Sequence, residues 1–416
     1  MVNYNTLGHN LKRGIFNFCT KLSDGLKKPT QKFIADMTYG IIASQSSYLT
    51  EMARKLNEKI ALDKTVDRLS RNLMDFDDTE ILVENYFNAV KPHFDENTVL
   101  IVDDSDISKP HSQKLEGLCK VKDGSTGEIT DGYWFAGVSA LTAKHKQPIP
   151  VYSRVYSSVE KDYVSNNTET IKSLKFLSKH FPKDNIRAFD RGYDGGYIFD
   201  YLIPKDESFI VRLVGNRNCI HNGETLLVST LAAKFKGKYV LKFEAKDGKK
   251  VDCKISFVPV FLPDYPDKPL NLVICRGFGK EPLMLLTNLN SDDNRLCVTI
   301  TKVYLLRWRI EEYYRFKKQN YGFEKFLVRS LHSIRNLDLL LSMAIGYIGI
   351  LSEKVDDSLE VMLIVEASKR LYGLAKFTLY AISDGLAEIF SKSRVGLRAF
   401  FRKPEYDPQL TLFNCA

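Results

Sequence analysis

The sequence predicts an α/β protein in which a mixed sheet lies between two helical regions. Apolar residues recur at spacings of three and four over residues 1–95, which indicates helices. Short segments rich in β-branched and aromatic residues fill residues 96–215 and indicate strands. Similar segments continue through 216–300 without a long helical pattern, so we expect an all-β insertion there. Helical spacing returns over 301–335, which we expect to complete the core, and continues through a helical C-terminal region, 336–416.

Composition places the chain among globular proteins. Its 416 residues are 44% hydrophobic and 27% charged, which excludes the disordered and fibrous classes. The seven cysteines contain no C-x-x-C pair, which argues against a disulfide framework and a thiolate metal site and favours a reducing, intracellular compartment. The N-terminus lacks a signal-peptide pattern. The most apolar run, Leu337–Leu351, is short and interrupted by polar residues, so we expect a buried core helix and no membrane association.

Positive charge gathers in two segments. Lys and Arg total 60 against 51 Asp and Glu, a net charge of +9. Residues 1–34 hold six basic side chains and one acidic one, and residues 301–330 hold eight basic and three acidic ones. Each segment has an excess of five, so the rest of the chain is about neutral. The first segment fits either a DNA-contacting arm or a solvated helix face, and both interpretations stay open.

The first part of the core predicts the order βββαβαβ, which is that of a mixed sheet. Three strands, TVLIVDD, YWFAGVSALTA and PIPVYSRVYS, precede a helix over Asn166–His180. A short strand, IRAFD, a helix capped by Asp194 and the strand FIVRLV follow. Within the insertion, we expect strands that include LLVSTL, KYVLKFEA and CKISFVPVF.

One predicted helix carries a polar constellation. Tyr304, Arg307, Glu311 and Lys318 lie at i, i+3, i+7 and i+14, which places them within a sector of roughly 60° if the helix is continuous. A carboxylate then shares a face with a guanidinium, an ammonium and a phenol. The alternative is a surface helix with ordinary i, i+4 pairing, such as Glu311 with Arg315.

Two further carboxylates lie where strands are expected to end. Asp103 follows the apolar run LIV, and Asp190 ends IRAFD. An Asp at the carboxyl end of a buried parallel strand is well placed for a ligand, although a turn or a helix cap is the alternative explanation. Asp103 and Asp104 point to opposite faces of a strand, so only one of them is expected to be a ligand.

Three carboxylates beside a basic helix face suggest phosphoryl transfer. Carboxylate oxygens are the ligands that Mg²⁺ and Mn²⁺ prefer. Two such ions about 4 Å apart activate an attacking water or 3′-hydroxyl and stabilise the leaving oxygen. Arg and Lys on the same face hold the phosphate backbone. The sequence therefore predicts a metal-dependent enzyme that cleaves DNA or transfers its strands.

These motifs resemble those of a known family, the DDE transposases of bacterial insertion sequences. The signature Y-x(2)-R-x(3)-E-x(6)-K is complete from Tyr304 to Lys318 and includes the string RWRIEE. Residues 101–105 match the element hhD-x-[ST], and residues 190–193 match D-R-G-[FY]. Reading the first element as D-[ST] instead would favour Asp104 over Asp103, and this alternative stays open.

The resemblance implies an RNase H-like catalytic core in which Asp103, Asp190 and Glu311 bind two Mg²⁺ ions, with Mn²⁺ as a substitute. It implies cut-and-paste transposition: cleavage at the transposon end, a DNA hairpin intermediate and strand transfer. It also implies double-stranded DNA partners, namely terminal inverted repeats and target DNA, and a homodimeric synaptic complex in the bacterial cytoplasm, at the nucleoid.

The resemblance also implies DNA contacts. It assigns them to the signature residues Tyr304, Arg307 and Lys318, and we add Arg191 beside Asp190. Trp308 either stacks on a base or packs in a core. We expect residues 1–95 to bind DNA and 336–416 to include a possible dimer interface.

Two other functions fit parts of the pattern. A transposase-derived DNA-binding protein without catalysis would keep the basic helices and lose an acidic ligand, but all three carboxylates are present. A metal-dependent DNA nuclease would share the ions but is not expected to carry the Y-R-E-K helix. Inverted repeats beside the coding region would distinguish a transposase from a nuclease.

Overall fold

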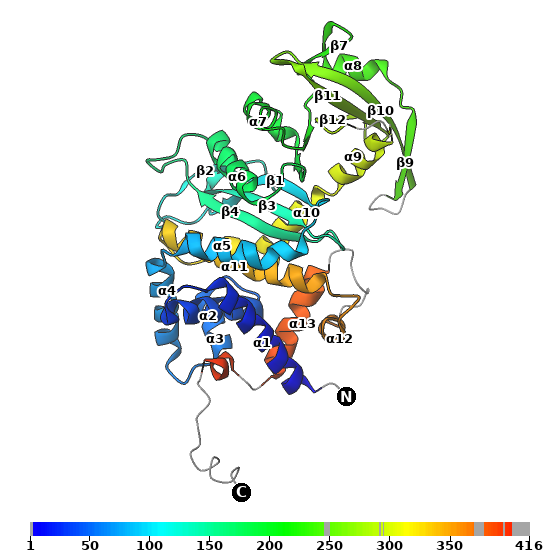
Figure 1. Ribbon diagram of the computed structural model, residues 1–416. Coiled ribbons are helices and arrows are strands. Elements are labelled where there is room, and N and C mark those ends of the chain that lie inside the picture. The colour runs from blue at the N-terminus through cyan, green and yellow to red at the C-terminus, as the bar shows by residue number, and fades with distance from the viewer. Residues whose placement is uncertain are drawn as a thin grey trace. The chain divides into compact units, whose positions relative to one another are not determined.

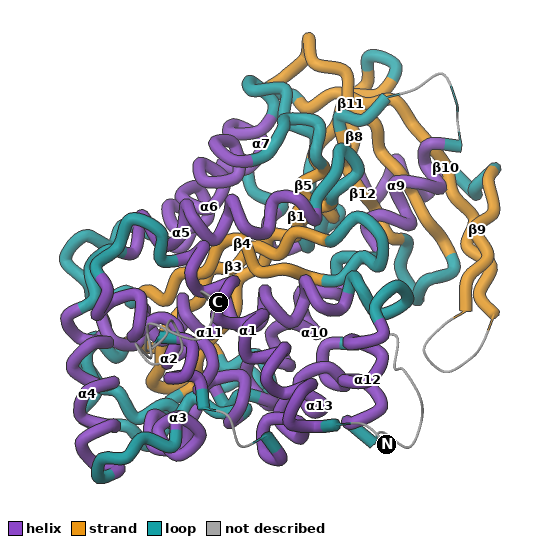
Figure 2. Tube along the Cα trace, turned by 60° about the horizontal axis from the view of Figure 1, so that its bottom comes forward, coloured by secondary structure: helices purple, strands orange, loops and turns teal. Residues whose placement is uncertain are grey.

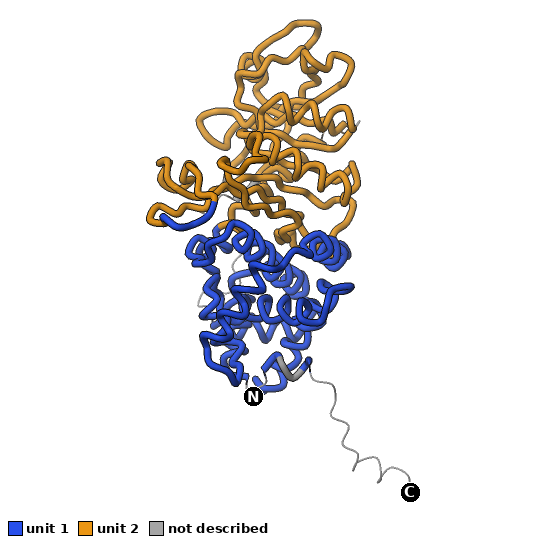
Figure 3. Tube along the Cα trace, turned by 90° about the vertical axis from the view of Figure 1, so that its left-hand side faces the viewer, with its two compact units in different colours: residues 1–92, 113–116, 315–416 blue, residues 93–112, 117–314 orange. Residues whose placement is uncertain are grey.

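The structure is a computed structural model that divides into two compact units (Figures 1 and 3). It describes residues 3–244, 250–290, 293, 295–369, 378–393 and 396–401. Unit 1 comprises Met1–Pro92, Gln113–Glu116 and Arg315–Ala416, and unit 2 comprises His93–Ser112 and Gly117–Tyr314. Each unit is described by itself.

Unit 1 is helical. Its N-terminal helices are α1 (Tyr4–Leu22), α2 (Lys28–Ser44), α3 (Leu49–Leu56), α4 (Leu62–Asp75) and α5 (Thr79–Val90). Its C-terminal helices are α11 (Leu331–Ser352), α12 (Leu359–Ala367) and α13 (Leu379–Lys392), preceded by a π-helical turn, Phe316–Asn320. These elements confirm helical N- and C-terminal regions. Parts of the predicted region 336–416, namely 370–377, 394–395 and 402–416, lie outside the described residues.

Helix α11 is the apolar centre of unit 1. It packs against α2, α4, α5 and α13, and Ser330 caps it by accepting a hydrogen bond from the backbone N–H of Ser333. The helix is long and apolar enough to cross a membrane, but 89% of its most apolar stretch is buried. The prediction of a buried core helix over Leu337–Leu351 is therefore confirmed.

Two lysines of the basic N-terminal segment are engaged within unit 1. Lys12 is buried, and its ammonium donates to the hydroxyl of Ser393 at 3.2 Å. Burial lowers the pKa of Lys12 to about 8. Lys32 pairs with the buried Asp36 at 2.6 Å. Neither the DNA-contacting arm nor the solvated helix face, the two interpretations of residues 1–34, therefore applies to all six basic side chains of that segment.

A buried ion pair fixes the π-helical turn to α11. The ammonium of Lys317 donates to Asp338 and, at 2.9 Å, to the hydroxyl of Ser342. Both charged side chains are almost fully buried, at 2% and 1% exposure. A buried charge is stable only while its partner remains, because desolvation is otherwise uncompensated.

We therefore expect Asp338→Ala to lower the free energy of unfolding of unit 1 by about 3–5 kcal/mol. Urea denaturation of the full chain measures this loss. The control is Glu324→Ala, which breaks the more exposed pair with Lys318 (3.0 Å) and should cost about 1 kcal/mol or less. Equal losses in the two variants would contradict the argument.

Unit 2 is built on one mixed sheet (Figure 2). Strand β3 (Ile129–Leu141) pairs antiparallel with β4 (Pro148–Tyr156), β2 (Cys119–Lys122) and β1 (Val99–Ser108). Strands β5 (Ile186–Phe189) and β6 (Phe209–Arg212) then join parallel to β1. Helices α6 (Asn166–His180) and α7 (Gly196–Leu202) connect the strands. This arrangement confirms the RNase H-like mixed sheet.

The β-rich insertion extends the same sheet. Beyond β6 the order continues through β12 (Leu283–Thr287), β11 (Tyr265–Arg276) and β10 (Lys250–Leu262), which also pairs with β9 (Tyr239–Glu244). Strands β7 (Asn218–His221) and β8 (Glu224–Leu227) end the order. Helix α8 (Val228–Lys234) replaces the last four residues of the predicted strand LLVSTL, because Val228, Leu231 and Ala232 bury one helical face at spacings of three and four.

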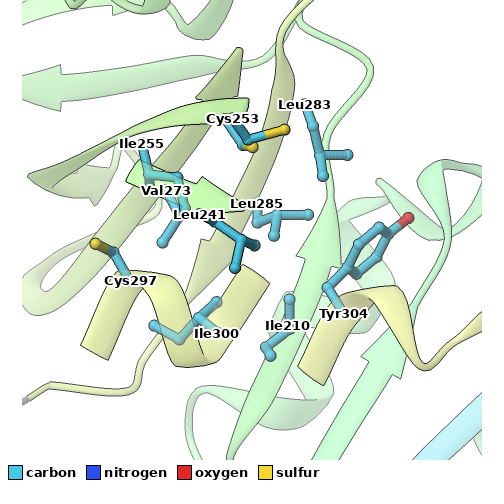
Figure 4. Packing of buried hydrophobic residues seen from close by; sticks show 11 residues of the cluster. Ile210, Leu241, Cys253, Ile255, Val273, Leu283, Leu285, Cys297, Ile300 and Tyr304 are labelled. Atoms are coloured by element: carbon cyan, nitrogen blue, oxygen red, sulfur yellow. The ribbon is translucent and has the colours of Figure 1, made fainter. Parts of the chain in front are cut away.

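The insertion and the helix after it share a core (Figure 4). Helix α9 (Leu296–Leu305) contributes Cys297, Ile300 and Tyr304 to a cluster with Ile255 and Leu285 of the sheet. Removal of these apolar side chains from water fixes α9 against β10–β12. The insertion thus positions the helix that carries the first residue of the Y-R-E-K signature.

Candidate active site

Three polar residues meet at the carboxyl edge of the parallel strands. Val102 of β1 lies opposite Phe189 of β5, and Phe189 lies opposite Val211 of β6. The residues that follow these three, Asp103, Asp190 and Arg212, therefore lie at one level. Polar side chains at this edge of an α/β sheet are placed for a ligand.

The prediction that Asp103 ends its strand is wrong. Strand β1 continues to Ser108 because the 13-residue strand β3 supplies antiparallel partners as far as Gly132. Only the parallel pairing with β5 stops beside Asp103, so the predicted edge exists although the strand passes it. Asp190 directly follows Phe189, the last residue of strand β5, as predicted. Its carboxylate accepts a hydrogen bond from the N–H of Gly192 and so caps a short turn over Arg191–Tyr193.

Asp103 lies within a cluster of carboxylates. Its carboxylate is 3.5 Å from a guanidinium nitrogen of Arg307. Burial raises the pKa of Asp103 to about 8, Arg307 opposes that rise, and the charges of Asp190, Asp104 and Glu311 add to it. Arg307 is thus a cation that opposes the carboxylate charges in this cluster.

Asp104 has different surroundings. Its pKa is raised to about 7, mainly by burial. The hydroxyl of Tyr193 opposes this rise, and the carboxylate of Glu169 on α6 adds to it. Asp104 also acts on the buried phenols of Tyr152 and Tyr156. Strand alternation therefore separates the two acids: Asp103 lies with Arg307 and Asp104 lies toward α6.

The predicted continuous helix from Tyr304 to Lys318 is wrong. Helix α9 ends at Leu305, and α10 runs from Trp308 to Arg315. Between them the backbone N–H groups of Arg307, Arg309 and Ile310 donate to carbonyls three residues earlier, which tightens the chain into a turn. Glu311 pairs with Arg307 at 2.6 Å, so Arg307 bridges Asp103 and Glu311.

The other predicted residues have surroundings of their own. Lys318 belongs to unit 1, where its ammonium lies 3.0 Å from Glu324. Arg191 is exposed on the turn after Asp190. Tyr304 is buried near Arg212, Arg307 and Asp190, which all act on its phenol.

A cleft of about 470 Å³ opens beside the cluster. Tyr304, Arg307 and Trp308 line it together with Arg212 and, from the insertion, Phe278, Lys280 and Glu281. Trp308 is half-buried, and the guanidinium of Arg309 lies 4.8 Å from its ring centre. Basic and aromatic side chains in one cleft suit a nucleic-acid strand, because they offer charge for phosphates and flat surfaces for bases.

Sequence reasoning missed Arg212 and Lys280. Arg212 is the last residue of strand β6, so the rule that selected Asp190 at the end of β5 would have selected it as well. Lys280 lies in a loop of the insertion between β11 and β12, and no sequence pattern pointed to its place in the cleft.

The cluster has the donor chemistry that a divalent cation prefers. Asp103, Asp190 and Glu311 carry carboxylate oxygens, and the charges of Asp190 and Glu311 both act on Asp103. Within the described residues, no group of three His, Cys, Asp or Glu side chains is gathered tightly enough to hold one ion. Arg307 lies between Asp103 and Glu311 and provides the positive charge there.

Comparison with known proteins matches the transposase DDE domain family over residues 95–346. No curated protein matches the sequence. Among solved structures, a piggyBac transposase in a synaptic complex with hairpin DNA, determined by cryo-electron microscopy, is similar at a TM-score of 0.45 and 9% identity. That similarity covers 91% of this chain and 75% of the other.

Proposed function

Because the chain belongs to the family of DDE transposases, we propose that it cuts the ends of an insertion sequence from DNA and joins them to target DNA. The observation that supports this reaction is the gathering of Asp103, Asp190, Glu311 and Arg307 at one edge of the sheet. Such cut-and-paste transposition would pass through a DNA hairpin at the cleaved end.

Asp103, Asp190 and Glu311 would hold the metal, as two Mg²⁺ ions or Mn²⁺ in their place. When bound, the ions supply an activated oxygen nucleophile and stabilise the leaving oxygen of the phosphodiester. The protein's own part is to hold the carboxylates in place, and Arg307 contributes by opposing the protonation of Asp103, whose pKa burial raises. Asp104 remains the alternative ligand to Asp103.

DNA would contact the basic cleft and the signature residues. Tyr304, Arg307 and Trp308 line the cleft, with Trp308 available for stacking on a base. Arg191 lies exposed beside Asp190, and Lys318 would bind phosphate from unit 1. Residues 1–95 would recognise the terminal inverted repeats, and 336–416 would include the dimer interface of a synaptic complex. The site of action would be the bacterial cytoplasm, at the nucleoid.

We expect Arg212→Ala to weaken DNA binding about equally for all sequences, because a guanidinium in this cleft meets phosphate rather than base edges. Filter binding across a salt series should show the slope of log affinity against log salt reduced by about 1. The control is Arg276→Ala, since Arg276 binds the backbone carbonyls of Phe235 and Ala232. An unchanged slope for Arg212→Ala would remove Arg212 from the DNA interface.

The experiment that tests the function is cleavage of DNA that carries the flanking terminal repeats, with Mg²⁺, by the full chain. A transposase cuts at the repeat ends and joins them to a second duplex. Cutting without joining and without preference for the ends would instead indicate a nuclease. Binding to the repeats without any cutting would indicate a DNA-binding protein derived from a transposase.

A further inference from the structure

One tyrosine connects the helix that carries Glu311 to the strand that carries Asp103. Tyr314 lies on α10, three residues after Glu311, and is buried. Its hydroxyl donates a hydrogen bond to the backbone carbonyl of Asp103, at 2.6 Å. Residues three apart lie on neighbouring parts of a helix surface, so this bond anchors the turn of α10 that presents Glu311.

The neighbouring strand leaves room for this contact. Gly137 of β3 lies directly opposite Asp103 of β1. A Cβ atom at Gly137 would lie 2.5 Å from the Tyr314 hydroxyl oxygen and 3.2 Å from a carbon of its ring. Real Cβ atoms essentially never lie as close as the first of these contacts, so a larger residue at this position would displace the Tyr314 hydroxyl. Phe135, two residues earlier on β3, packs against the Tyr314 ring edge to face, with ring centres 5.3 Å apart.

The cluster needs such an anchor because its charges repel one another. The charges of Asp190 and Glu311 act unfavourably on an ionised Asp103, and Glu311 stands on a helix only eight residues long. The helix is preceded by a turn, so α10 is not a direct continuation of α9. A neutral hydrogen bond to the backbone of Asp103 holds α10 against β1 without adding charge.

We propose that Tyr314 is a positioning residue, which with Gly137 holds α10 against β1 and so keeps Glu311 and Asp103 where their carboxylates can turn toward shared divalent ions. This inference rests on the proposed function. Tyr314 touches neither ion nor DNA in this role, because it acts through the backbone of Asp103. The residues that would bind the ions remain Asp103, Asp190 and Glu311.

Tyr314→Phe tests the proposal, because it removes only the hydroxyl and keeps the ring against Phe135. We expect Mg²⁺ binding to the full chain without DNA, measured by isothermal titration calorimetry, to weaken about tenfold, as is typical when a group behind a metal ligand is removed. Ca²⁺ binding should weaken less, because Mg²⁺ demands near-ideal octahedral geometry and Ca²⁺ does not. DNA binding in the absence of ions should not change.

The matched control is Tyr201→Phe, which removes another tyrosine hydroxyl of unit 2, bonded to Ser178 at 2.9 Å. It should leave both ion affinities at the wild-type value. Gly137→Ala, which pushes a methyl group against the Tyr314 hydroxyl, should reproduce the selective loss of Mg²⁺ affinity.

Two results would overturn the proposal: wild-type Mg²⁺ affinity in Tyr314→Phe, or equal losses for Mg²⁺ and Ca²⁺, which would indicate a merely structural role. Failure of the proposed function is a separate outcome. In that case the wild-type chain itself would bind no Mg²⁺ and cut no DNA.

Discussion

Asp103→Asn is expected to abolish DNA cleavage while stabilising the metal-free chain at alkaline pH. The loss of cleavage should be about a thousandfold or more, because a bound ion contributes several kcal/mol to the transition state and each 1.4 kcal/mol is tenfold in rate. Binding to terminal-repeat DNA should remain. Cleavage and binding assays at pH 8 with Mg²⁺ measure both effects.

The gain in stability follows from the pKa of Asp103. Burial raises this pKa to about 8 in the folded chain, from 3.8. Between about pH 4 and pH 8 the folded chain therefore holds a proton that the unfolded chain has released, so the free energy of unfolding falls as pH rises through this window. Asparagine does not ionise and escapes that fall. One pKa unit alone corresponds to about 1.4 kcal/mol.

The melting temperature of the Asp103→Asn chain, compared with wild type at pH 4 and pH 9 without metal, measures this gain. We expect no clear difference at pH 4 and an increase of about 3 °C or more at pH 9. A melting temperature below wild type at pH 9 would show that the ionised carboxylate stabilises the fold, and would contradict the raised pKa of Asp103.

The matched control is Asp104→Asn. Burial raises the pKa of Asp104 to about 7, so this variant should also gain stability at pH 9. It should nevertheless keep its cleavage activity, because Asp104 lies toward Glu169 rather than toward Arg307. If Asp104→Asn abolishes cleavage and Asp103→Asn does not, the first ligand is Asp104.

The choice between these two acids shows where sequence reasoning ended. Alternation along a strand places neighbouring residues on opposite faces but does not say which face meets the site. The structure distinguishes them through contacts that are distant in sequence, since Arg307 reaches Asp103 and Glu169 acts on Asp104. By contrast, the order of strands and helices in the core followed from periodicity, which is a local property.

The break between α9 and α10 could not be predicted from the same periodicity. The pattern from Tyr304 to Lys318 is compatible with one helix, and no Pro or Gly interrupts it. In the structure α9 packs on the insertion through Cys297 and Ile300, whereas α10 is bonded to β1 through Tyr314. Two separate packing requirements thus override local helix preference. The sequence carries no local signal for Tyr314 either, since its partner lies 211 residues earlier.

Asp194 illustrates the same limit on a smaller scale. The prediction that it caps the next helix is wrong, because Gly195 is the N-cap of α7. The Asp194 carboxylate instead accepts from the backbone N–H of Val214, at 2.8 Å, and pairs with Arg217. From sequence alone, capping is the local hydrogen bond expected for an Asp that precedes a helix. A cation from a later segment offers a stronger, charge-assisted bond.

Arg307→Ala is expected to separate two roles of one guanidinium, in ion binding and in DNA contact. Arg307 lies 3.5 Å from Asp103 and 2.6 Å from Glu311, and it holds the pKa of Asp103 below the value that burial alone would give. Its removal raises that pKa further, so a larger share of Asp103 is protonated at pH 7. Since an ion binds the deprotonated carboxylate, Mg²⁺ affinity at pH 7 should fall.

As the pH rises to 9, a larger share of Asp103 becomes ionised again, and no guanidinium competes with the ion for it. We therefore expect the Mg²⁺ affinity of Arg307→Ala, measured by calorimetry, to approach or exceed that of wild type at pH 9 while lying below it at pH 7. DNA cleavage at pH 9 with saturating Mg²⁺ should still be about 10- to 100-fold lower, because a charged hydrogen bond to phosphate, worth about 1.5–3 kcal/mol, is lost.

Arg307→Lys is the control for charge. It keeps a cation beside Asp103, so its Mg²⁺ affinity should follow the wild-type pH dependence, while the loss of the planar, two-pronged guanidinium should still lower cleavage. An Arg307→Ala chain with the wild-type pH dependence of Mg²⁺ binding would contradict the coupling between Arg307 and Asp103. Full cleavage activity in the Arg307→Ala chain would show that Arg307 does not contact the DNA, because the cleft would then hold the substrate without this guanidinium.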